Sequence, residues 1–111
     1  MKNNPRDDEL KKIRTDLYHH PEKIMKTDEA AESVFYSYRW FVVCWKMLFH
    51  VSYKEDVDRA RAQYIKMQIR KWKRIPEIAE SLSLSECAIS RIFKRVYGET
   101  IKEFFAREVG L

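Results

Sequence analysis

The chain has 111 residues, of which 22 are lysine or arginine and 17 are aspartate or glutamate, so its formal net charge is +5. This length suits one domain, or one domain with an arm, and a hydrophobic content of 45% is enough for a core. Because only two glycines and three prolines are present and no stretch alternates as a half-buried strand would, the composition argues against a β-rich protein and predicts an all-α fold.

The cysteines and the beginning of the chain bear on the cellular compartment. Cys44 lies in an apolar run and Cys87 in a predicted helix, which is too little for a disulfide framework. The first twelve residues are polar and charged and are not followed by an apolar run, so they do not look like a signal peptide. We therefore expect a cytoplasmic protein.

A short helix is the first predicted element, from Asp7 to about His19, within a polar N-terminal arm of residues 1–26. The acidic residues of its first turn would complement the helix dipole, and Pro21 ends it. His19 and His20 are adjacent and so would not point in the same direction from a helix. No spacing of Cys and His resembles a ligand set, so we expect no metal.

A long apolar helix is predicted within residues 27–53, beginning at Thr27, which could cap it, and ending at Val51. Its last 18 residues are apolar nearly all round, which raises the question of a membrane span. Arg39 and Lys46 argue against one, because they interrupt a run that is already barely long enough.

Two interpretations of this helix remain open. It can be the central helix of a monomer core, packed on most of its surface by its neighbours. It can also face a second subunit, because it has more apolar surface than the small C-terminal unit needs. For this second interpretation the candidate homodimer interface is Phe35, Tyr38, Phe41, Val42, Trp45 and Phe49.

The third predicted helix ends near Trp72 and belongs to a C-terminal unit of residues 54–111, with Ser52 and Glu55 as a capping box at its start. Trp72 is predicted to be a core anchor rather than a platform on which bases stack. Residues 59–74 contain seven basic residues and no acidic one. Such a run fits a polyanionic partner, and it also fits a solvated basic face.

Residues 75–105 predict a helix, a tight turn, a second helix, a glycine stop and a third helix. Ser85 is a good N-cap for the second helix, residues 86–97, and Gly98 lies where a left-handed cap would end it. Thr100 begins a capping box for the third. The apolar faces of the three helices are Ile75, Ile78, Ala79 and Leu82, then Ile89, Ile92, Phe93 and Val96, then Ile101, Phe104 and Phe105.

Over about residues 56–109 these features resemble the first helix-turn-helix unit of AraC/XylS-type transcription regulators. The matching residues are Ile78, Ala79, Leu82, Leu84, Ser85, the segment 89–95, Gly98 and Phe104. Two residues depart from the family's pattern, because Ser83 replaces the usual turn glycine and Arg74 the usual N-cap of the first helix. The family's DNA-binding domain also has a linker helix and a second helix-turn-helix unit, which this sequence does not match.

The resemblance implies a sequence-specific transcription regulator whose helix 86–97 enters the major groove of double-stranded DNA. It implies that Cys87, Ser90 and Arg91 point at base edges, and Arg91 could bind a guanine through two hydrogen bonds. Because one helix reads only a few base pairs, we expect a homodimer. The residues expected to contact phosphates are Lys71, Lys73, Arg74, Ser85, Lys94 and Arg95.

A rival hypothesis is a protein–protein interaction module. In it the helix-turn-helix is a scaffold, and the apolar helix docks RNA polymerase or another regulator without DNA contact. The outer face of helix 86–97 favours DNA, because it presents three basic residues and only one glutamate. No nucleophile–base pair, phosphate-cradling glycine loop or zinc motif is visible, so we expect neither an enzyme nor a cofactor.

Overall fold

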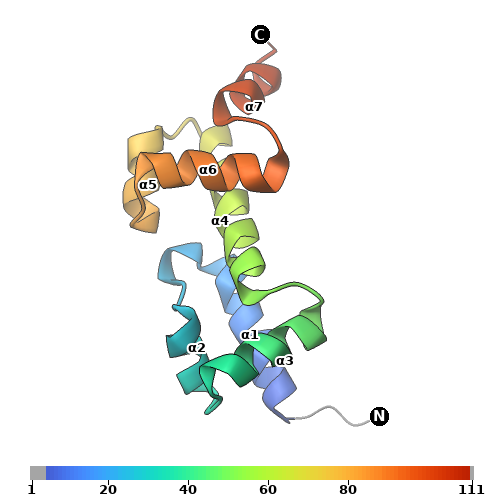
Figure 1. Cartoon of the computed structure of the whole chain (residues 1–111). Helices are drawn as coiled ribbons and strands as arrows, with labels where there is room; N and C mark the ends of the chain where they lie inside the picture. The colour runs from blue at the N-terminus through green and yellow to red at the C-terminus, as the bar shows by residue number, and fades with distance from the viewer. Residues whose placement is uncertain (1–4, 111) are drawn as a thin grey trace. The chain divides into compact units, whose positions relative to one another are not determined.

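The computed structural model describes residues 5–110, and in that part of the chain every regular element is helical (Figure 1). This confirms the predicted all-α fold. None of these helices has the length and apolar character that crossing a membrane requires. The elements are α1 (Pro5–His19), the short 3-10 helix η1 (Pro21–Lys23), α2 (Thr27–Ser33), α3 (Tyr38–Phe49), α4 (Tyr53–Arg70), α5 (Ile75–Leu82), α6 (Glu86–Tyr97) and α7 (Ile101–Glu108).

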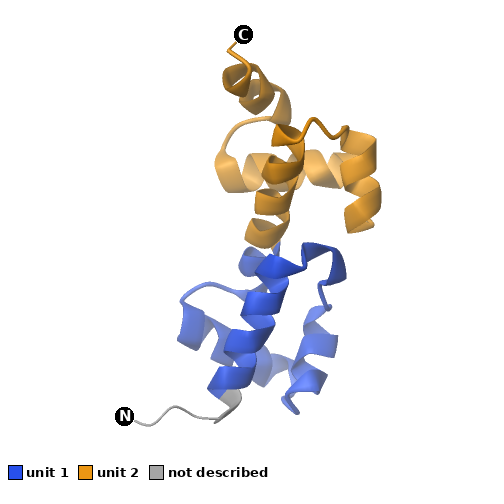
Figure 2. Cartoon of the chain, turned by 180° about the vertical axis from the view of Figure 1, so that it is seen from behind, with its two compact units in different colours: residues 1–57 blue, residues 58–111 orange. Residues whose placement is uncertain are grey.

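The chain divides into two compact units (Figure 2). Unit 1 comprises residues 1–57 and unit 2 comprises residues 58–111. The first residues of α4 therefore belong to unit 1 and the rest of α4 belongs to unit 2. The sequence instead predicted three segments, residues 1–26, 27–53 and 54–111. In the structure the first two of these segments belong to one unit.

The apolar segment over residues 27–51 is two helices, α2 and α3, and not the single helix that the sequence predicted. The chain leaves α2 at Phe35, whose φ of 60° is left-handed. A new helix begins after Ser37, whose Oγ accepts a hydrogen bond from the backbone N–H of Trp40 at 3.2 Å. Thr27 lies inside α2 and is not its N-cap. The aromatic run concealed this break, because neither glycine nor proline marks it.

Aromatic side chains form the centre of unit 1. Phe41 and Trp45 are fully buried on α3, and their ring centroids lie 5.6 Å apart. Tyr53 packs edge to face against both, at 5.3 Å and 4.9 Å. Leu10 and Leu17 of α1 are also buried. Because α1 buries these side chains, it packs on the core of unit 1 with its apolar face and is not a polar arm.

A carboxylate lies in this core. Asp56, in the first turn of α4, is fully buried, and its two oxygens accept hydrogen bonds from Nε and Nη2 of Arg14, each at 3.1 Å. The hydroxyl of Tyr18 donates to Asp56 at 2.7 Å, and the indole N–H of Trp45 donates at 2.9 Å. A buried charge is tolerated when it is paired and hydrogen-bonded in this way. Asp56 therefore ties α1 and α3 to the start of α4.

Aliphatic side chains dominate the core of unit 2. This core is built from α4, α5, α6 and α7, and it contains the apolar faces that the sequence predicted for residues 75–105. Its buried members are Ala62, Ile65, Ile69, Ile78, Ala79, Leu82, Ile89, Ile92, Phe93, Ile101 and Phe104.

The ends of α6 and the start of α7 are where the local signals place them. The hydroxyl of Ser85 accepts a hydrogen bond from the backbone N–H of Ala88 at 3.1 Å, and α6 ends at Gly98 with a φ of 74°. Thr100 and Glu103 form both hydrogen bonds of a capping box. These predictions are confirmed, because each depends on contacts within four residues.

The end of α4 differs from the prediction. The sequence predicted that this helix extends to Trp72 and that the Trp72 ring is buried in the core. In the structure α4 ends at Arg70, and Trp72 is 70% exposed with a left-handed φ of 62°. The prediction of a core anchor was therefore wrong. Because the helix stops earlier, Trp72 is out of phase with the buried residues Ile65 and Ile69.

Candidate nucleic-acid interface

Helix α6 has one face in the core of unit 2 and the opposite face in solvent. Ile89, Ile92 and Phe93 are buried, and the 3.6-residue period directs the intervening positions outward. The N-cap hydrogen bond of Ser85 and the left-handed backbone at Gly98 fix both ends of the helix. The exposed residues are Glu86, Cys87, Ser90, Arg91, Lys94 and Arg95.

The residues predicted to face base edges lie together on this outer face. Ser90 and Arg91 follow Cys87 by three and four positions, a spacing that places both side chains on the same side of the helix as Cys87. All three are exposed, and Cys87 is a free thiol. Within residues 5–110, Arg91 makes no ion pair, so its guanidinium is available to a ligand.

Two of the predicted phosphate contacts have partners inside unit 2. Nη1 of Arg95 lies 2.6 Å from Oδ2 of Asp58, and Nζ of Lys94 donates to the carbonyl oxygen of Gly98 at 3.2 Å. The ion pair balances the charge of Arg95, so this residue fits a phosphate contact less well than the sequence suggested. Lys94 keeps its charge, because its partner is a neutral carbonyl.

The other predicted phosphate contacts flank α5. Lys71, Lys73 and Arg74 are exposed in the loop between α4 and α5. The backbone of Arg74 forms the N-cap of α5, while its side chain makes no capping hydrogen bond. In the turn that follows α5, the hydroxyl of Ser85 accepts one hydrogen bond and keeps its own hydrogen for donation. The loop cations and α6 therefore belong to the same unit. In the sequence, the cations precede α5 and α6 follows it.

The net charge of the chain belongs to unit 2. Residues 58–111 contain 12 Lys or Arg and 7 Asp or Glu, whereas residues 1–57 contain 10 of each. Some of the anions in unit 2 are balanced locally. Arg70 donates to Glu108 at 2.8 Å, and this hydrogen bond lowers the pKa of Glu108. Unit 2 therefore has an excess of positive charge, and the exposed cations of α6 and of the loop before α5 are part of it.

The residues of the predicted dimer interface differ in exposure. Phe41 and Trp45 are completely buried in their own unit, so they have no surface to offer a partner, and this part of the prediction is corrected. Val42 and Phe49 are half-buried. Only two of the predicted residues are well exposed, Phe35 at 85% and Tyr38 at 59%.

A different side of α3 is exposed and apolar. Trp40, Val43 and Met47 are 52%, 40% and 70% exposed, and their spacing of three and four residues aligns them along the helix. We call these three residues the α3 stripe. Arg39 and Lys46 are exposed beside it. Sequence reasoning missed the stripe because the whole segment is apolar, and only the burial of Phe41 and Trp45 shows which side is free.

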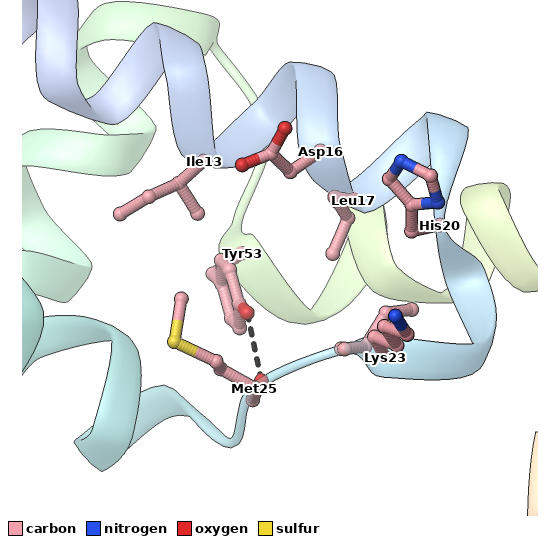
Figure 3. A pocket seen from close by; sticks show the side chains of 8 residues that line it. Ile13, Asp16, Leu17, His20, Lys23, Met25 and Tyr53 are labelled. Carbon is pink, nitrogen blue, oxygen red and sulfur yellow. Dashed lines mark hydrogen bonds between the residues drawn. The ribbon is translucent and has the colours of Figure 1, made fainter.

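Unit 1 also contains a pocket of about 340 Å³ (Figure 3). Ile13, Leu17 and Met25 form apolar parts of its wall, together with the ring of Tyr53, whose hydroxyl donates to the carbonyl oxygen of Met25 at 2.7 Å. Asp16, His20 and Lys23 add polar groups. The volume is at the low end for a small-molecule site. No sequence pattern predicts this pocket, because its walls come from separate segments.

In the part of the chain that the structure describes, no group of three or more His, Cys, Asp and Glu side chains is placed to hold a metal ion. No protein-family model, curated protein or solved structure matches this chain. The residues and their arrangement are therefore the basis for a function.

Proposed function

We propose that this protein is a sequence-specific transcription regulator that binds double-stranded DNA through unit 2. The observation that supports this is the two-sided character of α6. The major groove of B-DNA admits an α-helix, and a helix that enters it needs one face packed on a scaffold and the other free. α6 meets both conditions, because Ile89 and Phe93 are buried and Arg91 is exposed on the opposite face.

Each exposed residue of α6 has a role in this proposal. Arg91 binds O6 and N7 of a guanine through two hydrogen bonds, the commonest specific contact in the major groove. Ser90 can donate to or accept from a neighbouring base edge. Cys87 makes a mainly apolar contact, for example with a thymine methyl group. The resemblance to AraC/XylS-type regulators supports the same assignment.

Phosphate contacts position α6 without reading sequence. We assign this role to Lys71, Lys73 and Arg74 in the loop before α5, to the hydroxyl hydrogen of Ser85 and to Lys94. Arg95 is excluded from this set because it is paired with Asp58. The charge distribution supports the proposal, because a polyanion would meet a unit with 12 basic and 7 acidic residues.

Two copies are needed for useful specificity. We propose a homodimer that places two reader helices about 34 Å apart, one turn of DNA. The α3 stripe is the candidate contact, because Trp40 and Met47 are exposed apolar residues on the side of α3 opposite the core. Three side chains cover far less than the roughly 800 Å² per partner of a standard interface. We therefore expect a weak dimer that forms mainly on DNA.

Substitution of the reader arginine tests DNA binding. A preferred site would first be selected from random duplexes. Arg91→Ala should then weaken binding to that site by about 1–3 kcal/mol and relax specificity at one base pair. The matched control is Lys12→Ala on α1, an exposed cation of unit 1, which should leave affinity unchanged. If wild-type protein shows no salt-dependent binding to any duplex, DNA binding is refuted.

Substitutions on α3 test the dimer. Trp40→Glu with Met47→Glu should leave the protein folded, keep binding to a duplex with one half-site, and abolish cooperative binding to two half-sites. Phe41→Asp should instead unfold unit 1, because its side chain is fully buried. Unchanged cooperativity in the double variant would remove the α3 stripe from the interface.

The α3 stripe also supports a second candidate function. An exposed apolar helix face fits an interaction module that docks RNA polymerase or another regulator, with the helix-turn-helix as a scaffold. This function predicts no retention on duplex DNA at low salt and no effect of Arg91→Ala. Electrophoretic mobility shift with the wild-type protein separates the two candidates.

A further inference from the structure

We infer that Trp72 contacts DNA, with its ring packed against the sugar–phosphate backbone beside the base pairs that α6 reads. The inference rests on the proposed DNA binding of unit 2. It adds an apolar contact to the loop before α5. The sequence predicted only charged contacts from this loop, made by Lys71, Lys73 and Arg74.

The backbone at Trp72 is of a kind that favours glycine. The N–H of Lys73 donates to the carbonyl of Gln68 at 3.0 Å, and the N–H of Trp72 donates to that of Ile69 at 3.0 Å. These two bonds form a Schellman motif in which Trp72 is the left-handed residue, with a φ of 62°. A side chain with a Cβ atom destabilises this conformation, so glycine is usual there.

Packing within the protein does not compensate for this conformation. Trp72 is 70% exposed. It packs edge to face with Phe105 of α7, with ring centroids 5.2 Å apart. This contact orients the ring but covers little of it. A large aromatic group is therefore held in solvent at a strained position, and strained positions of this kind cluster at ligand-binding sites.

The residues that flank Trp72 in the sequence point to a polyanionic partner. Exposed cations precede and follow it in the sequence, and residues 59–74 contain no acidic residue. The Trp72 ring is flanked by cations. It is therefore complementary to the DNA backbone, in which each deoxyribose ring lies between two anionic phosphates. The loop leads directly into α5, which precedes the reader helix α6. Contacts from such flanking loops fix the register of a recognition helix on the duplex.

Fluorescence quenching tests the contact directly. Trp45 is fully buried, so in Trp40→Phe protein the acrylamide-accessible emission comes from Trp72. Addition of a random-sequence duplex should protect this emission from acrylamide. Unchanged quenching when the duplex is saturating would overturn the inference.

Substitution of the ring gives the second measurement. Trp72→Gly should bind duplex DNA about tenfold more weakly than wild type. The melting temperature reports separately on folding, and we expect the glycine to raise it or leave it unchanged, because it relieves the left-handed strain. Trp72→Phe should retain part of the affinity. Met67→Ala removes an exposed apolar side chain on α4, outside the loop, and is the matched control, with unchanged affinity expected.

The outcomes separate the inference from the proposal beneath it. If wild type binds duplex DNA and Trp72→Gly binds equally well, the inference fails and the proposed function stands. An effect of Trp72→Gly on single-stranded oligonucleotides alone would also refute it, because the duplex backbone would not be the partner. If wild type binds no duplex at all, the proposed function fails and the inference fails with it.

Discussion

The two units of this protein are of similar length but are stabilised in different ways. Unit 2 has a mainly aliphatic core, and its helices α6 and α7 begin and end at residues with strong local preferences, Ser85, Gly98 and Thr100. Unit 1 has an aromatic core built around a buried carboxylate, Asp56, and its helix α2 ends at Ser33, two residues before a left-handed phenylalanine, Phe35.

The two units differ in whether local or long-range interactions determine their structure. In unit 2, the two caps of α6, the N-cap of α7 and the apolar faces of α5, α6 and α7 are specified by residues within one or two helical turns. In unit 1, Asp56 is stable only because Arg14 lies 42 positions away in the sequence and Tyr18 lies 38 positions away. The charge follows the same division, since unit 1 is neutral and unit 2 has the positive excess.

The largest expected effect concerns the buried carboxylate. Asp56→Ala should destabilise unit 1 by about 3–5 kcal/mol, because it leaves the Arg14 guanidinium without its counter-charge. Urea unfolding followed by the emission of Trp45 measures this loss. Asp58→Ala is the control, because it breaks a pair with the exposed Arg95 and should cost no more than about 1 kcal/mol. Equal losses for the two variants would contradict the special role of Asp56.

A comparable loss should follow from a cavity in the aliphatic core. Phe93 is fully buried and packs against Tyr97 and Phe104, at 4.9 Å and 5.5 Å between ring centroids. Phe93→Ala should cost about 3–5 kcal/mol. The same change at Phe35, which is 85% exposed, should shift stability by less than about 0.5 kcal/mol. Thermal unfolding of both variants tests whether burial, rather than residue type, decides the effect.

A smaller effect compares two left-handed turn residues of unit 2. Gly98 has a φ of 74°, which a residue with a Cβ atom adopts only with strain, so Gly98→Ala should destabilise the protein by about 1 kcal/mol. The added Cβ would meet no atom within 4 Å, so the cost comes from the backbone and not from a clash. Ser83 has a φ of 56° at the end of α5. Ser83→Gly should have the opposite sign, between no change and a gain of about 1 kcal/mol. Destabilisation by both variants would contradict this account of the two turns.

The smallest expected effect depends on pH. Glu103 accepts the backbone N–H of Thr100 at 3.0 Å, and this hydrogen bond lowers the pKa of Glu103 below its ordinary 4.5. A carboxyl group with a lowered folded pKa adds stability above its unfolded pKa and loses it as the pH falls through the folded value. Glu103→Gln should therefore reduce the loss of stability below pH 4.5. Glu80→Gln on α5 is the exposed control, and an identical change in both would contradict the assignment.

The arrangement of the candidate DNA interface was largely predictable from the sequence. The bounds of α6, the burial of Ile89 and Phe93, and the exposure of Arg91 all follow from helical periodicity and a serine cap. The pairing of Arg95 with Asp58 was not predictable, because the two residues are 37 positions apart and on different helices. Likewise, the α3 stripe could be recognised only after the core had selected the opposite side of α3.

The sequence by itself determined the all-α class, the helices of unit 2 and their apolar faces, because caps and periodicity act within about one turn. The tertiary structure alone decided three other features. They are the break at Phe35, the exposure of Trp72 and the burial of Asp56. Asp56 depends on Arg14 and Tyr18, which are distant in sequence, so helical periodicity cannot predict its burial. The left-handed backbone at Phe35 and Trp72 interrupts the helical period where no glycine or proline marks a break, so periodicity does not predict these two features either.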